Sequence, residues 1–353
     1  QLNLDHNPVA VKEKFIEIKG ARLHNLKNID INIPRNQLVV VTGVSGSGKT
    51  TLIKHIFHPL LQNHLDDLLS SDAIGQAYLS GPIKRITQIE LINQQSIGRS
   101  SRSNPATYVK AYDDIREIFK QQQISKIRGY QPKHFSFNVE GGRCENCKGE
   151  GELLVEMQFL ADVALPCEDC NGKRFKNEIL EVQYKGKNIF EVLNLSIEEA
   201  LDFFYDKREI VKKLKPLFDV GLGYLKLGQS SSTLSGGEAQ RLKLGYYLGL
   251  EDYAQHVFFI FDEPTTGLHF DDVKKLLFAL DSLVEKGHTV LVIEHNMDVL
   301  KNADWLIDLG PGGGKHGGQL LYEGTPEGIL KVKNSYTAKY LQPKLKIEKK
   351  KAK

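Results

Sequence analysis

A glycine-rich segment, Gly43-Val-Ser-Gly-Ser-Gly-Lys-Thr50, is the first stretch of this chain whose residue types and spacing could do chemistry. Its glycines let the backbone wrap closely and aim N–H groups at a phosphate, helped by the N-terminus of the following helix. We expect Lys49 to reach the β- and γ-phosphates of a nucleotide, and the Thr50 hydroxyl to ligate Mg²⁺. The predicted nucleotide-binding residues of this segment are Gly43, Ser45, Gly46, Ser47, Gly48, Lys49, Thr50 and Thr51.

Two adjacent carboxylates end the apolar run Phe258-Phe-Ile-Phe-Asp-Glu263, as in a Walker B motif. Asp262 is predicted to bind Mg²⁺, and Glu263 to orient and deprotonate an attacking water. Acids that merely cap a helix after a strand are the alternative. The following Pro264-Thr-Thr-Gly-Leu268 favours the catalytic interpretation.

The run Leu234-Ser-Gly-Gly-Glu238 resembles the signature of ATP-binding cassette (ABC) ATPases. Ser235 and the amides of Gly236 and Gly237, at the start of a helix, would form an anion site for a γ-phosphate. They lie too far along the fold to reach their own phosphate loop. We therefore expect two cassettes to face head to tail, each completing the site of the other.

The same resemblance assigns two further residues. His295 follows the apolar strand His288–Glu294 and corresponds to the switch histidine that senses the γ-phosphate. A lone histidine is more often structural, so its place at a strand end after a Walker B motif is what favours this role. Gln94 is the weaker candidate for the Q-loop residue, which links metal and water to the inserted domain, because Gln95 adjoins it.

Four cysteines form two pairs, Cys144-Glu-Asn-Cys147 and Cys167-Glu-Asp-Cys170, separated by 19 residues. This spacing is typical of a four-thiolate zinc site, which has no open position and is structural. A glycine two residues after each pair permits tight turning around the metal. Two disulfides and a redox role are the alternatives, and we expect neither in a cytosolic protein.

The segment between Lys84 and Lys148 is strongly basic, with twelve Lys and Arg against six acids. Such a segment can meet phosphates, and the interleaved Tyr130, Phe135 and Phe137 would suit stacking on nucleic acid. In the alternative, the aromatic rings pack the zinc module and the charges are merely solvated. The candidate DNA-binding residues are Arg99, Arg102, Lys126, Arg128, Lys133 and Arg143.

The elements that must position these residues indicate an α/β fold. Nearly continuous apolar strands are expected at 38–42, 256–262, 288–294 and 305–308, as in a sheet buried on both faces. Helices are expected at 50–57 and 271–286, a further strand at 318–324 with a helix beginning at Thr325-Pro326, and another strand at 153–159.

The 185 positions between Lys49 and Leu234 exceed a simple crossover and predict an inserted domain. The predicted organisation is an ABC domain of the P-loop type in two parts, 1–80 and 230–340. A signature and zinc domain is inserted at 81–229, and a lysine-rich, disordered tail follows at 341–353.

Composition indicates a globular protein of 353 residues, 41% hydrophobic and 26% charged. There is no apolar run of about 18 residues and no signal-peptide pattern, so we expect no membrane partner and a cytoplasmic location. The start at Gln1 rather than Met suggests an excised fragment. The formal charge of +3 hides a tail with six Lys against Glu348.

An ABC cassette with a four-cysteine module between phosphate loop and signature resembles the UvrA family, in its C-terminal half. These proteins are the damage-recognition subunits of the bacterial nucleotide-excision repair excinuclease. The motifs that carry the resemblance are 20–28, 43–50, 97–99, 102–108, 135–138, 141–144, 221–224, 234–242 and 262–269.

The resemblance implies ATP hydrolysis with Mg²⁺, a zinc module, head-to-tail pairing, and binding of damaged duplex DNA through its deformability. No nuclease activity of its own is expected. In proteins of this family, the region that docks the helicase partner UvrB lies in the N-terminal half. Two stretches depart from the family pattern: Asn93-Gln-Gln-Ser96 and Gly245-Tyr-Tyr-Leu-Gly249.

Three rival functions stay open at this point. A UvrA-like resistance ATPase acting on drug-modified DNA shares every motif above. A non-hydrolysing scaffold is disfavoured by Asp262, Glu263 and His295. A membrane-transporter cassette is disfavoured by the zinc ligands of the insert.

Overall fold

The computed structural model describes residues 15–66, 77–95, 103–155, 163–250 and 256–351, with the side chains of 154–155 and 346–351 left aside. The chain forms two compact units, one of residues 1–93 with 250–353 and the other of residues 94–249. We call them the nucleotide unit and the insert unit.

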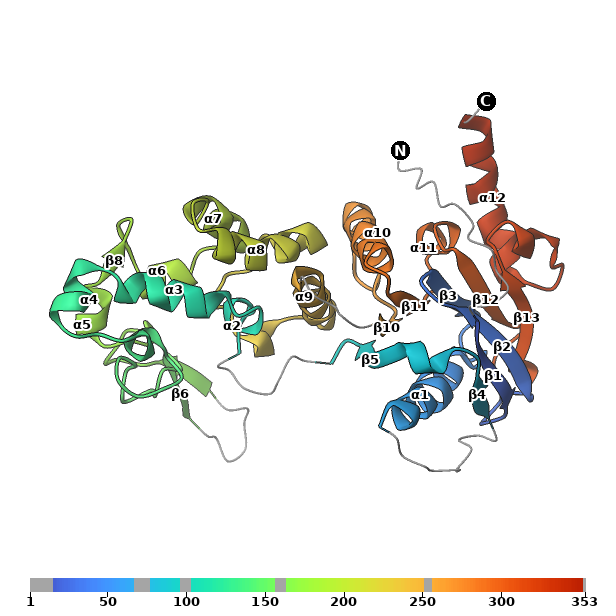
Figure 1. Ribbon diagram of the computed structural model, residues 1–353, viewed down its shortest axis with the longest axis horizontal. Helices are drawn as coiled ribbons and strands as arrows, with labels where there is room; N and C mark the ends of the chain where they lie inside the picture. The colour runs from blue at the N-terminus through green and yellow to red at the C-terminus, as the bar shows by residue number, and fades with distance from the viewer. Residues whose placement is uncertain (1–14, 67–76, 96–102, 156–162, 251–255, 352–353) are drawn as a thin grey trace. The chain divides into compact units, whose positions relative to one another are not determined.

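A six-stranded sheet is the centre of the nucleotide unit (Figure 1). Its strand order is β13-β12-β3-β11-β10-β5, and all neighbours are parallel except the antiparallel pair β12 and β13. The predicted apolar strands all belong to this sheet. The bounds are β3 Leu38–Gly43, β5 Ile86–Ile92, β10 His256–Asp262, β11 Thr289–Ile293, β12 Trp305–Gly310 and β13 Gln319–Gly324.

One face of this sheet is covered by the helix that follows the phosphate loop. This helix begins as a π-helical segment, η1 (Thr51–Phe57), and continues as α1 (His58–Leu65). Its apolar side chains lie between the large sheet and a small antiparallel sheet of β1 (Phe15–Ala21), β2 (Ile29–Pro34) and β4 (Tyr78–Ser80).

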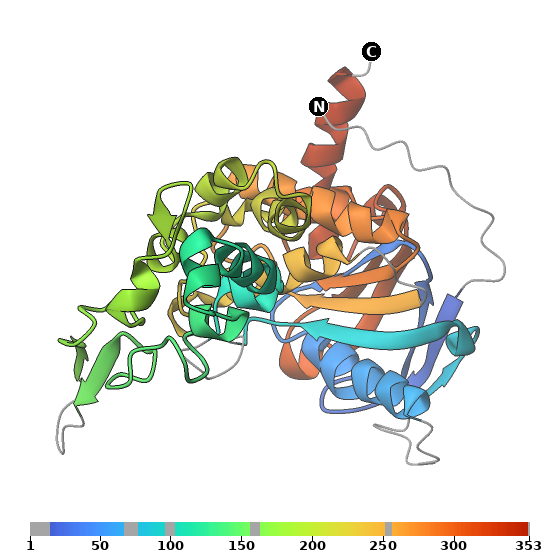
Figure 2. The ribbon, with the colours of Figure 1, turned by 60° about the vertical axis from the view of Figure 1, so that its left-hand side comes forward.

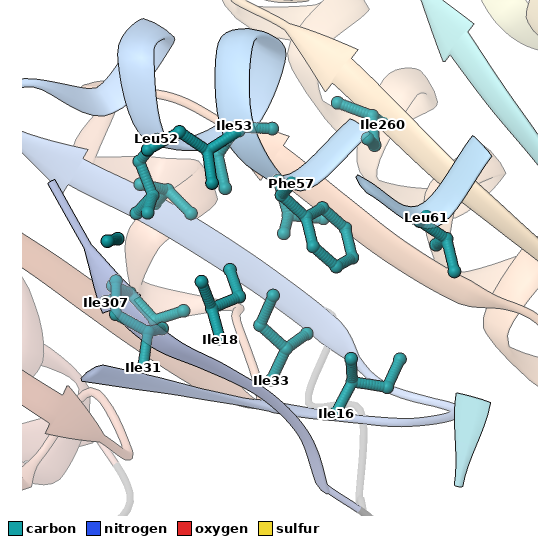
Figure 3. Packing of buried hydrophobic residues seen from close by; sticks show 14 of the residues in the cluster. Ile16, Ile18, Ile31, Ile33, Leu52, Ile53, Phe57, Leu61, Ile260 and Ile307 are labelled. Atoms are coloured by element: carbon teal, nitrogen blue, oxygen red, sulfur yellow. The ribbon is translucent and has the colours of Figure 1, made fainter. Parts of the chain in front are cut away.

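Figure 3 shows the resulting core, in which Phe57 packs among isoleucines of both sheets. Burying one such side chain stabilises the fold by about 1.5–3 kcal/mol. The phosphate loop is therefore anchored at both ends, by β3 and by this helix.

The opposite face carries α10 (Phe270–Glu285) and α11 (Met297–Lys301), as Figure 2 shows for α10. The C-terminal helix α12 (Tyr336–Lys351) contacts α11 and β3. The predicted disordered tail is thus largely helical in the structure. The expected helix start at Thr325 is absent among the described residues, and a short 3-10 segment, η8 (Gly328–Lys331), follows β13 instead. Two further 3-10 segments are η3 (Ile83–Arg85) and η7 (Gly314–His316).

Three helices form the packed centre of the insert unit: α3 (Ala111–Lys120), α8 (Arg208–Leu217) and α9 (Gly236–Gly249). Helices α8 and α9 approach closely at Gly245, where a Cβ would lie 2.6 Å from Leu217 Cδ2. The short helices are α2 Pro105–Tyr108, α4 Gln123–Ile127, α5 Asn177–Leu180, α6 Ile189–Leu193, α7 Ile197–Phe203, η4 Pro132–Phe135, η5 Phe218–Leu222 and η6 Ser231–Thr233.

Two small hairpins complete the insert unit. One pairs β6 (Glu152–Val155) with β7 (Val163–Pro166), and the other pairs β8 (Gln183–Tyr184) with β9 (Lys187–Asn188). The strand predicted at 153–159 is present as β6 up to Val155, and the rest of it lies outside the described residues.

The compact units divide at other residues than the predicted insert 81–229. β5 lies before the division because it pairs in parallel with β10 and so completes the large sheet. The signature helix α9, assigned above to the second part of the ABC domain, belongs to the insert unit because it packs against α8.

Candidate nucleotide and metal sites

The phosphate loop lines a pocket with a volume of about 520 Å³ in the nucleotide unit. Glu263 and His295 line the same pocket, although they follow two other strands. The remaining lining residues are Asn25, Gly43, Val44, Ser45, Gly46, Gly48, Lys49, Thr50 and Thr51. Because β3, β10 and β11 are parallel, their carboxyl ends meet at one edge of the sheet, where ligands of such folds bind. Of the predicted loop residues only Ser47 is absent from this lining, since it is fully buried.

Lys49 is held by the loop that it follows. Its ammonium donates to the carbonyls of Gly43, at 2.8 Å, and Val44, at 2.9 Å. Burial lowers the pKa of Lys49, while the carboxylates of Glu263 and Asp308 oppose this shift. These carboxylates balance the positive charge of Lys49 only in part. A bound phosphate would supply the remaining negative charge.

A second glycine-rich loop, 310–318, braces the phosphate loop. The N–H of Gly314 donates to Gly46 O at 3.0 Å, and the N–H of Gly318 donates to Ser47 O at 3.0 Å. Asn25 Nδ2 joins both loops through Gly46 O at 2.9 Å and Gly314 O at 3.2 Å. Gly318 is required because a Cβ there would lie 1.8 Å from Asn25 O.

The two carboxylates after β10 have different surroundings. Asp262 forms an ion pair with Lys54, which lies one helical turn after Thr50. A cation therefore already faces the carboxylate that is predicted to bind Mg²⁺. Both the Asp262 carboxylate and the Thr50 hydroxyl offer the oxygen ligands that Mg²⁺ prefers, so these residues fit the ion.

Glu263 adopts a left-handed backbone conformation, with φ of 45°. For a residue other than glycine this conformation costs on the order of 1–3 kcal/mol and is typical of functional sites. A hydrogen bond from its N–H to Ile293 O, at 2.9 Å, ties it to the end of β11. His295, two residues beyond Ile293, has a side chain that is 67% exposed and therefore available to a ligand.

The four cysteines of the insert unit meet in one buried cluster, with all ligand atoms within 4.8 Å of one another. The Sγ atoms of Cys144 and Cys167 are 3.9 Å apart, and those of Cys147 and Cys170 are 3.7 Å apart. These separations are too long for disulfides and match the edge of about 3.8 Å that four sulfurs form around a tetrahedral zinc. The four side chains therefore fit a zinc ion.

The turns around the cysteines have the predicted form. Gly149 and Gly172, two residues after each pair, have φ of +88° and +75°. The N–H of Gly151 donates to Cys147 Sγ at 3.3 Å, a contact that orients a metal-binding thiolate.

The family model described as "ABC transporter" matches residues 26–139. The chain is 52% identical over 335 residues to UvrABC system protein A of Aquifex aeolicus, covering 95% of this chain and 36% of that protein. It is 51% identical to the Haemophilus influenzae protein of the same name, covering 94% of this chain and 35% of that protein.

Among solved structures, UvrA2 from Deinococcus radiodurans superposes with a TM-score of 0.86 and 43% identity, over 97% of this chain and 41% of that chain. Over nearly its whole length, the chain is similar to one part of the UvrA family proteins. It spans about a third of the length of the curated relatives it matches. Among the helices that the structure describes, none combines the length and the apolar character that a bilayer crossing requires.

The UvrA-type signature starts α9 in the insert unit, where Glu238 accepts hydrogen bonds from Ser235, one of the predicted anion donors. Ser235 donates to Glu238 Oε2 through its N–H, at 2.7 Å, and through Oγ, at 2.8 Å. Tyr224 donates to the other carboxylate oxygen at 2.6 Å. Burial would raise the pKa of Glu238, but these donors outweigh burial and lower it. The start of α9 thus accommodates an anionic oxygen.

Gln94 belongs to this unit as well. A Cβ on Gly236 would lie 2.9 Å from Gln94 Cβ, so the Q-loop candidate lies against the signature. Gly237 lies in the first turn of the same helix.

The candidate DNA-binding residues of this UvrA-type insert differ in their contacts. Arg128 forms an ion pair with Glu181 and also donates to Glu178 O at 3.1 Å. Arg143 is mostly buried and donates to Asn138 O at 3.2 Å. Lys126 and Lys133 have no acidic partner among the residues that the structure describes. Arg99 and Arg102 lie outside those residues.

The interleaved aromatic rings pack the unit. Phe135 and Phe137 are buried, and they contact Phe119 and Phe175 respectively. The interpretation of these two rings as a stacking surface for nucleic acid is therefore wrong, and the packing alternative is correct for them. Among the candidate DNA-binding residues that the structure describes, Lys126 and Lys133 are the exposed ones without an acidic partner.

Sequence reasoning missed several residues of the nucleotide site. Asn25, Lys54 and Glu294 act on the site through contacts with residues far away in the chain. The loop 310–318 could have been predicted from the sequence, because seven of its nine residues are glycine or proline.

Proposed function

We propose that this chain is the ATP-hydrolysing, DNA-binding part of a UvrA-type protein of nucleotide-excision repair. The observation that supports the proposal most strongly is that the phosphate loop, Glu263 and His295 line one shared pocket. Its volume of about 520 Å³ is of the size that small-molecule ligands occupy. The family relationship supports the same activity.

The chain's own residues divide the work of hydrolysis. The amides of the phosphate loop and the Lys49 ammonium bind the phosphates, and Thr50 with Asp262 would hold Mg²⁺, which neutralises developing charge on the phosphate oxygens. Glu263 orients a water and takes its proton, while His295 contacts the γ-phosphate. The left-handed backbone at Glu263 keeps that carboxylate aimed into the pocket before the substrate arrives.

The signature supports pairing of two cassettes, either two copies or this chain and the rest of a longer protein. In a closed pair, Ser235 and the N-terminal amides of α9 would receive the γ-phosphate held by the other cassette. Ser235 donates to the Glu238 carboxylate in the single chain, so a phosphate would have to displace that carboxylate from Ser235.

The cysteine cluster supports a structural zinc held by Cys144, Cys147, Cys167 and Cys170. Four thiolates leave no position for a substrate, so the metal serves folding. The zinc would hold the insert in a fixed form for duplex DNA, with damage recognised through deformability rather than sequence. DNA as a substrate implies work in the cytoplasm, and UvrB would be engaged through the remaining length of the protein.

Light scattering and ATP turnover on one preparation test this proposal. We expect saturable, Mg²⁺-dependent hydrolysis and a doubling of mass with ATP in the Glu263→Gln variant. Gel shifts should show tighter binding to a lesion-bearing duplex than to the intact one. A verified pair that binds neither duplex would refute the DNA-binding role. A folded wild-type chain that binds ATP without turnover would refute the enzymatic role.

A further inference from the structure

Glu294 is a fully buried acidic residue next to the nucleotide pocket, with 0% exposure of its side chain. It ends the apolar run of β11 and directly precedes His295. A buried carboxylate is costly unless hydrogen bonds satisfy its oxygens. The contacts of Glu294 therefore indicate what it is for.

Both carboxylate oxygens accept two hydrogen bonds each. Oε1 accepts from the N–H of Thr265, at 2.9 Å, and from the Thr265 hydroxyl. Oε2 accepts from the N–H of His295, at 2.7 Å, and from that of Asn296, at 2.9 Å. One side chain thus joins the segment after Glu263 to the segment that carries the switch histidine.

The two joined segments carry Glu263 and His295, the residues proposed to act in ATP hydrolysis. Thr265 lies two residues after Glu263, whose left-handed backbone must be held by its surroundings. On the other side, the peptide of His295 itself donates to Glu294, and Asn296 then caps α11 by accepting from Asp298 N at 2.9 Å. Neither segment can shift without breaking hydrogen bonds to the same carboxylate.

We propose that Glu294 is a positioning residue that keeps Glu263 and His295 in register for hydrolysis. The inference rests on the proposed ATPase activity for its kinetic consequence, but its structural content stands independently. Glu294 does not line the pocket. It therefore acts on the reaction through the backbone of these two segments and through the His295 ring, whose Nδ1 lies 3.9 Å from Glu294 Oε2.

The chemistry of the four donors makes Glu294→Gln the sharpest variant. A carboxylate accepts at both oxygens, whereas an amide accepts at one end and donates at the other. In either orientation the NH₂ group would face backbone N–H donors, of Thr265 or of His295 and Asn296. The closest isostere should therefore disrupt the junction rather than preserve it.

Hydrogen exchange and kinetics on the full chain test this proposal. In Glu294→Gln we expect exchange to rise at least tenfold in both peptides 263–269 and 294–298, and to stay unchanged in the phosphate loop. The turnover number should fall by about 10²-fold, as for small misplacements of catalytic groups, while the Kd for ATP changes less than about threefold.

A second pair of variants keeps the test valid if Glu294→Gln fails to fold. Thr265→Val removes one donor and should raise exchange around His295, whereas Thr265→Ser keeps the hydroxyl and should restore wild-type behaviour. The exposed neighbour Thr266 gives a matched control, Thr266→Val, with no change expected.

Unchanged exchange at 294–298 in both folded variants would overturn the proposal, as would an equal loss of ATP binding and turnover. Absence of turnover in the wild-type chain would instead refute the proposed ATPase function. In that case the coupled exchange of the two peptides still decides whether Glu294 joins them.

Discussion

In the nucleotide unit, the candidate functional side chains lie at the ends of buried parallel strands. In the insert unit, they lie in the turns that contain the cysteines and at the start of helix α9. Strands β3, β10 and β11 are almost wholly buried, and their hydrogen-bonded register determines where the phosphate loop, Glu263 and His295 meet. Around the cysteine cluster, the residues that the structure describes form a two-stranded hairpin and irregular turns.

The difference teaches what each site depends on. The nucleotide pocket is built by the sheet and its core, so it should exist before any ligand binds. The four cysteines form a buried cluster of their own, and such thiols gain their stability from a metal. Loss of the metal should therefore affect one unit and leave the other intact.

The strongest way to break this comparison is Cys147→Ser. Removing one thiolate should eliminate stoichiometric zinc and unfold the cysteine module, since metal binding and folding are one process in such small modules. Metal analysis and limited proteolysis of the insert report this change. ATP affinity should stay within about threefold, and a larger loss would mean that the two units are not independent. Glu168→Gln, an exposed change between two of the ligands, is the matched control.

Within the nucleotide unit, Glu263→Gln should remove the chemistry and leave the binding. We expect the turnover number to fall about 10³-fold because the amide cannot take a proton from water. ATP should then accumulate on the protein and stabilise the paired state, which light scattering measures. Glu285→Gln, at the exposed end of α10, serves as control. Normal turnover in Glu263→Gln would remove this residue from its assigned role.

The opposite end of the same strands offers a pH test that should not touch the site. Burial, with smaller effects of His256 and Lys286, lowers the pKa of His288 to about 4. An unfolded chain binds this proton near pH 6.5, so stability should be lost as the pH falls from about 6.5 to 4, by at most about 3 kcal/mol.

The variant His288→Asn retains an acceptor for the N–H of Val257, which now donates to His288 Nδ1 at 3.3 Å, but cannot titrate. Urea unfolding at several pH values should show a shallower loss of stability in this variant than in the wild type. An identical pH dependence would contradict the assignment. ATP turnover at pH 8 should be the same in both proteins.

For the insert unit, Lys126 and Lys133, the candidate DNA-binding residues without an acidic partner among the described residues, distinguish DNA contact from a merely solvated surface. Lys126→Ala and Lys133→Ala should each weaken duplex binding by about five- to tenfold at low salt and reduce the salt slope by about one. Arg128→Ala should change DNA affinity less, because its guanidinium is engaged with Glu181. Fluorescence anisotropy over a salt series measures both quantities. Equal effects of all three variants would indicate a general charge effect rather than a defined contact.

Sequence patterns predicted for a physical reason that the phosphate loop, Glu263 and His295 lie together. Apolar strands followed at once by a glycine loop, by Asp262-Glu263 or by His295 place those residues at one edge of a parallel sheet, whatever surrounds them. The cysteine spacing likewise limits where four thiolates can meet. The positions of these residues follow from local chain geometry and from the topology of the sheet.

The residues that were missed depend on contacts made only in the folded chain. Lys54 reads as one polar position in a buried helix, and only the fold brings it to Asp262. Phe135 and Phe137 looked like a stacking surface because an aromatic residue in a basic segment has the same pattern whether it is buried or exposed. The unit boundaries at Gln94 and Gly249 depend on the strand pairing of β5 and on the packing of α9.

The smallest effect is expected at the Lys54–Asp262 ion pair of the nucleotide unit. Both side chains are about one-quarter exposed, so the pair is screened in part and its removal should change metal affinity by only about 1 kcal/mol. In Lys54→Met the Asp262 carboxylate loses its internal counter-charge and should bind Mg²⁺ more tightly. Turnover measured against free Mg²⁺ should reach half its maximum at about fivefold lower concentration, with the maximum itself little changed. If Lys54 were instead needed to orient Asp262, the Mg²⁺ concentration required for half-maximal turnover would rise. The position of the carboxylate would then depend on a neighbouring side chain, as the cysteine module is expected to depend on its metal.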